Sequence, residues 1–224
     1  MCFRYLPFLI LGLAFLGRHA AAQDPAKLPK IVLIGDSIRL SYAPTVEKQL
    51  AGKAVIVHPK ANGMDSANVL KNLAAWAVAE KPDIVHFNCG IHDTKKDKKT
   101  GTFQVPPEKY EANLRKIVET LRKETKATVI FATTTPIIDE RAAKGRVNAA
   151  YDLLDASTVE YNLIALKVMK ELNVPVDDLR AVCGEGEARA KLMTADGVHF
   201  TPEGQTKLGK AVAEFLAKQL PAKP

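Results

Sequence analysis

Residues 31–42 read "IVLIGDSIRLSY", an apolar run that ends in Gly-Asp-Ser and continues into a polar segment. The run 31–34 is continuously apolar rather than alternating, which is typical of a strand buried on both faces of a parallel sheet. Ser37 then has two interpretations. It can cap a following helix, or it can act as a nucleophile. An isolated Gly-Asp-Ser favours the cap, so the nucleophile requires a base and an oxyanion site elsewhere in the chain.

Four further apolar runs rich in Val and Ile follow along the chain. They span 54–59, 83–90, 127–135 and 174–176. Amphipathic segments with helical spacing lie between or after them, near 66–80, 107–123, 157–172 and 202–219. This alternation predicts a three-layer α/β/α domain, with a flavodoxin-like, doubly wound, five-stranded parallel sheet. Ligands bind at the carboxyl ends of the strands in such sheets, so functional residues are expected there.

The N-terminal segment has the parts of a secretory signal peptide. Arg4 precedes the apolar run 6–16, and Ala20–Ala22 offers a small-residue cleavage site. The run is shorter than the roughly 20 residues that span a bilayer. We therefore predict a signal peptide over 1–22, one domain over 23–224, a secreted or periplasmic location, and no stable membrane anchoring after cleavage.

Composition excludes several classes of function. Residues 1–22 hold two of the 32 basic residues and none of the 25 acidic ones, so cleavage lowers the net charge from +7 to +5. No basic and aromatic pattern indicates a nucleic-acid module. No H-E-x-x-H or paired C-x-x-C indicates a metal, and no G-x-G-x-x-G or P-loop follows the first strand. We expect no cofactor, no metal and no nucleic-acid partner.

Two cysteines, Cys89 and Cys183, follow the predicted signal peptide. An exported protein can join such a pair in one disulfide. Cys89 lies in an apolar run, where a buried free thiol fits as well. The sequence leaves both alternatives open.

Polar segments follow the first three predicted strands, at Gly35–Ser37, Asn62–Gly63 and Gly90–Asp93. A fourth polar segment, "DGVHF", spans 196–200 near the C-terminus. The first three segments belong at one edge of a parallel sheet, where they would face a common crevice.

The fourth segment supplies the partners that a serine nucleophile needs. The imidazole of His199 can take the proton of the Ser37 hydroxyl, since histidine titrates near neutral pH. Asp196, three residues earlier, can orient that imidazole and stabilise its cation. His199 alone would be interpreted as a structural surface histidine. Together with the strand-end segments, it indicates a base.

In these blocks the sequence resembles the SGNH or GDSL-type serine hydrolases. "GDS" at 35–37 looks like the nucleophile block, and Gly63 in "ANGMDS" looks like the glycine block. "GIHD" at 90–93 stands where the family has G-x-N-D, and "DGVHF" looks like the closing D-x-x-H block. Each block is weak alone, but their order covers almost the whole of 23–224.

The resemblance implies that Ser37 attacks an ester carbonyl and that His199 activates the water that releases the acid. The backbone N–H groups of Ser37 and Gly63 would hold the oxyanion, together with the side chain of the third block. Here His92 replaces the family's asparagine. A histidine ring can donate as well, and loss of one such donor costs about 2.7–4 kcal/mol. Alternatively, His92 contacts substrate, and Asn88 or a water completes the hole.

The resemblance therefore implies a serine esterase, and small exported members of the family resemble carbohydrate O-deacetylases. We expect an ester of a small molecule or a polysaccharide as substrate. The alternatives are a short-chain lipid esterase or thioesterase, an acyltransferase, a non-catalytic carbohydrate-binding domain with an impaired oxyanion hole, and a flavodoxin-like nucleotide binder.

Residues 93–107 are expected to form a long charged loop, with solvated lysines as the simplest interpretation. Alternatively, four of these lysines attract an acidic polysaccharide. They are Lys95, Lys96, Lys98 and Lys99.

Overall fold

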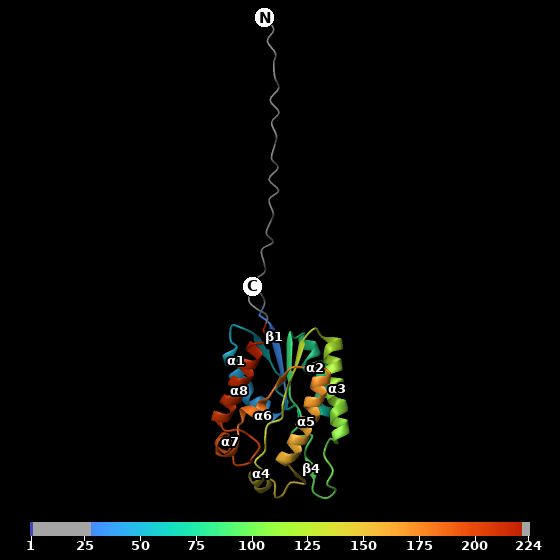
Figure 1. The fold of residues 1–224 in the computed structure, drawn as a ribbon, viewed down its shortest axis with the longest axis vertical. Helices are drawn as coiled ribbons and strands as arrows, with labels where there is room; N and C mark the ends of the chain where they lie inside the picture. The colour runs from blue at the N-terminus through green and yellow to red at the C-terminus, as the bar shows by residue number, and fades with distance from the viewer. Residues whose placement is uncertain (2–27, 221–224) are drawn as a thin grey trace.

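A five-stranded parallel sheet forms the middle layer of the protein, seen in a computed structural model that describes Met1 and residues 28–220 (Figure 1). Its strand order is β2-β1-β3-β5-β7, and every neighbouring pair is parallel. The strands are β1 (Lys30–Ile34), β2 (Val55–Val57), β3 (Ile84–Phe87), β5 (Thr128–Ala132) and β7 (Val176–Asp177). The order reverses beside β1, so the predicted flavodoxin-like, doubly wound sheet is confirmed.

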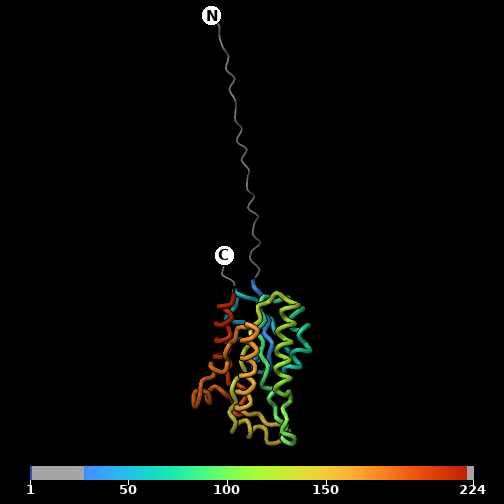
Figure 2. The backbone as a smooth tube through the Cα atoms, turned by 45° about the vertical axis from the view of Figure 1, so that its right-hand side comes forward, coloured from blue at the N-terminus to red at the C-terminus, as the bar shows by residue number. Residues whose placement is uncertain are grey.

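Helices cover both faces of this sheet, as Figures 1 and 2 show. One face carries α1 (Ser37–Gln49) and α8 (Pro202–Ala217). The other carries α2 (Ser66–Trp76), α3 (Pro107–Glu124) and α5 (Asp155–Glu171). Shorter elements complete the described chain: η1 (Val78–Glu80), α4 (Asp139–Gly145), α6 (Leu179–Val182) and α7 (Gly186–Leu192). The four helices predicted from apolar spacing are confirmed with shifts of a few residues at their ends.

The expected loop at 93–107 contains a short strand, which corrects that expectation. β4 (Lys96–Asp97) pairs antiparallel with β6 (Tyr151–Asp152). The Lys98 ammonium donates to the carbonyls of Arg146 and Val147, at 2.8 and 3.3 Å, so this lysine is not simply solvated. Each of these strands has only two residues. The sequence could not predict them, because an alternating apolar and polar pattern needs several residues.

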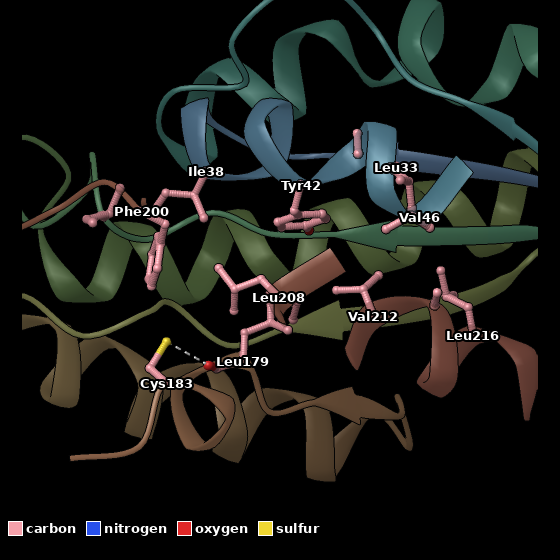
Figure 3. Close-up of a cluster of buried hydrophobic side chains, with 14 of the residues drawn as sticks. Leu33, Ile38, Tyr42, Val46, Leu179, Cys183, Phe200, Leu208, Val212 and Leu216 are labelled. Carbon is pink, nitrogen blue, oxygen red and sulfur yellow. Dashed lines mark hydrogen bonds between the residues drawn. The ribbon is translucent and has the colours of Figure 1, made fainter. Parts of the chain in front are cut away.

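The apolar cluster between α1, α8 and the sheet joins two distant parts of the chain (Figure 3). Ile38, directly after Ser37, and Phe200, directly after His199, are both buried in it. Farther along, Tyr42 and Val46 of α1 face Leu208, Val212 and Leu216 of α8. Full burial of one large apolar side chain contributes about 1.5–3 kcal/mol. The cluster therefore fixes the C-terminal "DGVHF" segment beside the start of α1.

Cys89 and Cys183 are both free and buried. Cys89 belongs to the apolar cluster under α2, α3 and α5, whereas Cys183 belongs to the cluster under α1 and α8. The sheet separates them, so the disulfide alternative is wrong. The Cys183 thiol instead donates to the carbonyl of Leu179 at 3.2 Å (Figure 3).

Residues 2–22 of the predicted signal peptide lie outside the described residues. Within the part of the chain that the structure describes, no helix is long and apolar enough to cross a membrane.

Candidate active site

Ser37 is the first residue of α1 and follows β1 after a two-residue turn. Asp36 caps the helix, because its carboxylate accepts from the N–H of Ile38 at 2.9 Å. The backbone N–H of Ser37 makes no hydrogen bond to any residue that the structure describes. This N–H lies in the first turn of a helix, where unpaired N–H groups and the helix dipole favour negative charge. The turn thus presents the hydroxyl and a free donor at the carboxyl edge of the sheet.

His199 and Asp196 lie beside this hydroxyl. His199 Nε2 is 2.9 Å from Ser37 Oγ, and His199 Nδ1 is 2.5 Å from Asp196 Oδ2. An ionised carboxylate only accepts hydrogen bonds, so Nδ1 carries the ring proton and Nε2 is left to accept from the serine hydroxyl. This tautomer and orientation are those that a general base for Ser37 requires.

Asp196 is held as a carboxylate by several donors. Its Oδ1 accepts from Thr194 Oγ1 at 2.6 Å and from the N–H groups of Val198 and His199 at 3.0 Å each. Burial by itself raises the pKa of Asp196, but these bonds and the His199 contact outweigh it and lower the pKa well below the ordinary value. Asp196 is therefore ionised wherever His199 can act as a base.

Thr194 is a site residue that the sequence analysis missed. Its hydroxyl bonds Asp196, and its N–H donates to the carbonyl of His199 at 2.9 Å. Both bonds close the turn that contains Gly197, whose φ is +69°. A Cβ there would lie 2.5 Å from the carbonyl oxygen of Ile138, so only glycine fits. A hydroxyl two residues before the aspartate was the available signal in the sequence.

Gly63 contacts the nucleophile turn directly. Its N–H donates to the carbonyl of Gly35 at 2.9 Å, and a Cβ at position 63 would lie 2.6 Å from that oxygen. The position therefore requires glycine because the two backbones approach closely. Its N–H is engaged in this structure, so a role toward an oxyanion requires that this bond be shared or exchanged when substrate binds.

His92 is neutral at pH 7 in this environment. Burial and, second, the charge of Lys95 lower its pKa to about 4. The neutral ring carries one N–H that can donate, and it does not repel a protonated His199. The alternative donor, Asn88, is engaged elsewhere, because its amide donates to the carbonyl of Ala132 at 3.0 Å. Because this amide is engaged, His92 remains the candidate for the third donor.

Asp93 ties the His92 turn to the start of α2. Its carboxylate accepts from the Ser66 N–H at 3.0 Å and from the Ser66 hydroxyl at 2.5 Å. Asn113 of α3 donates to the same hydroxyl at 2.9 Å. This buried network keeps the third block at a fixed distance from the segment that follows Gly63.

Arg39 is a second residue that the sequence analysis missed. It is fully buried in α1, two residues after Ser37. Its guanidinium donates to the carbonyls of Gly35, Pro59 and Ala61 at 3.0, 2.8 and 2.9 Å. These three carbonyls replace water as hydrogen-bond acceptors for the buried cation. Arg39 thus fastens the segment before Gly63 to the nucleophile turn.

The described residues contain no group of three or more His, Cys, Asp or Glu side chains that could hold a metal ion. The reactive groups that the structure brings together are the Ser37 hydroxyl, the His199 imidazole and the Asp196 carboxylate. Such a set matches serine acyl transfer, in which a hydroxyl attacks a carbonyl carbon.

Residues 33–207 match the family model described as the GDSL-like lipase/acylhydrolase family. The chain belongs to this family. A GDSL esterase/lipase of Arabidopsis thaliana is 26% identical over 194 residues, covering 79% of this chain and 80% of the relative. An isoamyl acetate-hydrolyzing esterase 1 homolog of Rattus norvegicus is 24% identical over 219 residues, covering 92% of this chain and 88% of the relative.

Solved structures share the fold. A lipase/acylhydrolase from Enterococcus faecalis superposes with a TM-score of 0.73 at 23% identity, covering 88% of this chain and all of that chain. An acetylxylan esterase from Geobacillus stearothermophilus gives a TM-score of 0.65 at 19% identity, covering 83% and 93%. The family and the fold agree with the resemblance seen in the sequence.

The first prediction concerns Arg39. In an Arg39→Lys variant one ammonium replaces the two guanidinium nitrogens that reach these carbonyls, so we expect the Gly63 segment to shift relative to Ser37. A misplacement of about 1 Å can cost about 100-fold in rate. We expect ester hydrolysis to lose about tenfold or more in kcat while KM changes less than about threefold. Arg115→Lys, on the surface of α3, is the matched control. An unchanged kcat in Arg39→Lys, with the variant folded, would contradict the positioning role.

The second prediction concerns Asp196 and pH. Its folded-state pKa is lowered, so the ionised carboxylate stabilises the fold above the unfolded pKa of about 3.9, and this contribution is lost as the pH falls through the folded-state pKa. Urea unfolding should show Asp196→Asn less stable than the natural protein at pH 5, with a smaller difference at pH 3. A difference that grows between pH 5 and pH 3 would overturn the assignment.

Proposed function

We propose that this protein is an exported serine carboxylic-ester hydrolase with a Ser37–His199–Asp196 triad. The observation that carries the proposal is the pair of contacts on His199, with Ser37 Oγ 2.9 Å from one ring nitrogen and Asp196 bonded to the other. Export rests on the signal-peptide pattern of residues 1–22.

The geometry supports a two-step mechanism. His199 Nε2 takes the proton of Ser37 as Oγ attacks the ester carbonyl carbon, and Asp196 stabilises the imidazolium that forms. The negative oxygen of the tetrahedral intermediate lies toward the N–H of Ser37 and the ring of His92. The C–O bond of the ester then breaks, and the alcohol leaves with the proton from His199. A water, deprotonated by His199, hydrolyses the acyl-enzyme and restores the Ser37 hydroxyl.

An acetyl group is the acyl group that we propose, and a carbohydrate is the proposed alcohol. Acetyl is supported by two independent likenesses, since the Rattus relative is named for isoamyl acetate and the Geobacillus structure for acetylxylan. A second candidate is an acetate ester of a small alcohol, which the first of these names favours.

Ser37→Ala tests the nucleophile. We expect hydrolysis of p-nitrophenyl acetate to fall by about 10⁴-fold or more, because a triad acts as a unit. Covalent labelling by a fluorophosphonate should disappear in the same variant. Ser41→Ala is the matched control, since this α1 hydroxyl bonds only the carbonyl of Ile38 among the described residues. A natural protein that neither turns over the ester nor takes the label would instead favour the carbohydrate-binding domain.

His92→Ala and His92→Asn test the third donor. If the imidazole N–H holds the oxyanion, His92→Ala should lower kcat by about 10²–10³-fold with little change in KM. His92→Asn should regain a large part of that loss, because an amide can donate from a similar position. Equal kcat in His92→Ala and the natural protein would remove His92 from the oxyanion hole. A raised KM with an unchanged kcat would assign it to substrate contact.

A further inference from the structure

A groove of about 260 Å³ lies outside the site described so far. One wall comes from Lys95, Asp97, Thr102, Phe103 and Gln104, and the other from Ala150 and Tyr151. The antiparallel pair β4–β6 holds the two walls together. Lys98 reinforces this connection, because its N–H donates to the carbonyl of Ala150 at 2.9 Å.

Each wall of the groove is attached to a segment that carries a candidate active-site residue. Gln104 donates to Asp65 at 2.5 Å, two residues after Gly63. The Lys95 N–H donates to the carbonyl of His92 at 3.3 Å, and the Lys95 charge helps to lower the pKa of His92. Tyr151 packs against the apolar cluster that contains Val198, the neighbour of His199. The groove is therefore joined by hydrogen bonds to the segments that carry His92 and Gly63.

Two charged side chains line the groove, the Asp97 carboxylate and the Lys95 ammonium. The Asp97 carboxylate accepts from the N–H groups of Lys99 and Thr100 at 2.9 and 2.8 Å. The Lys95 ammonium lies 4.9 Å from the centre of the Tyr151 ring and forms no ion pair with the residues that the structure describes. Lys96 lies just outside, with its ammonium 5.6 Å from the Phe103 ring.

This combination suits a particular ligand chemistry. The Tyr151 ring holds the Lys95 ammonium over its face, in a cation–π contact that positions the charge without neutralising it. An ammonium without an acidic partner attracts an anionic group of the ligand. The groove therefore holds a positioned positive charge between its two walls, since Lys95 belongs to one wall and Tyr151 to the other.

We propose that this groove binds the sugar portion of the ester, and that the Lys95 ammonium, held over the Tyr151 ring, binds a carboxylate of an acidic sugar. The proposal rests on the proposed hydrolase function and names its substrate class as an acetylated uronic-acid carbohydrate. Of the four lysines in 93–107, it selects Lys95, because Lys98 is engaged by backbone carbonyls and Lys99 does not line the groove.

The test compares two forms of one substrate. An O-acetylated oligogalacturonide is used as such and after methyl esterification of its carboxyl groups, and kcat/KM is measured for each. Lys95→Gln should lower the preference for the charged form by about tenfold, the usual size of one charge-assisted bond. Lys99→Gln, a neighbouring exposed lysine, should leave the preference unchanged. An unchanged preference in Lys95→Gln would overturn the proposal.

A binding measurement separates this proposal from the hydrolase function. Calorimetry with unacetylated oligogalacturonide and the Ser37→Ala variant reports the groove without turnover. Addition of Lys95→Gln should weaken binding by about tenfold. If Ser37→Ala with its natural Lys95 does not bind the oligogalacturonide, the groove proposal is rejected, even if the natural protein hydrolyses p-nitrophenyl acetate. Binding without any ester hydrolysis would support the groove and reject the hydrolase.

Discussion

The apolar contact between the start of α1 and the segment before α8 is the interaction on which the site depends. Ser37 and His199 are 162 positions apart in the sequence. Their neighbours Ile38 and Phe200 are buried in one cluster, so the hydrophobic effect brings the two polar groups together without itself involving them. The residues that carry chemistry can then stay partly exposed, while adjacent residues contribute the stability.

A single carbonyl, that of Gly35, organises the other half of the site. It accepts the N–H of Gly63 and the guanidinium of Arg39, which connects the end of β1, the second block and the nucleophile helix. A buried arginine is costly unless its donors are satisfied. Here backbone carbonyls accept from the two terminal nitrogens, while Nε has no partner among the described residues, and the loop that carries the carbonyls is fixed in return. Precision in this half of the site therefore derives from backbone hydrogen bonds rather than from apolar packing.

The sequence was sufficient for the sheet, the main helices and the placement of Ser37, Asp196 and His199. Continuous apolar runs identify buried strands, and the ends of parallel strands meet at one edge. The sequence did not predict the roles of residues whose hydrogen-bond partners lie in distant parts of the chain. From the sequence alone, Arg39 is expected at the surface. Its burial depends on hydrogen bonds to carbonyls of a loop about 20 residues away in the sequence. The engagement of the Gly63 N–H likewise depends on a backbone 28 positions earlier in the sequence.

The two separated thiols have a consequence for how the protein can be made and observed. Neither Cys89 nor Cys183 forms a disulfide in the fold, so folding of the described domain requires no oxidant for these two thiols. Burial also raises the pKa of both thiols, which keeps them protonated and unreactive while the structure is closed. Because they lie on opposite sides of the sheet, their alkylation rates would report separately on the opening of each layer.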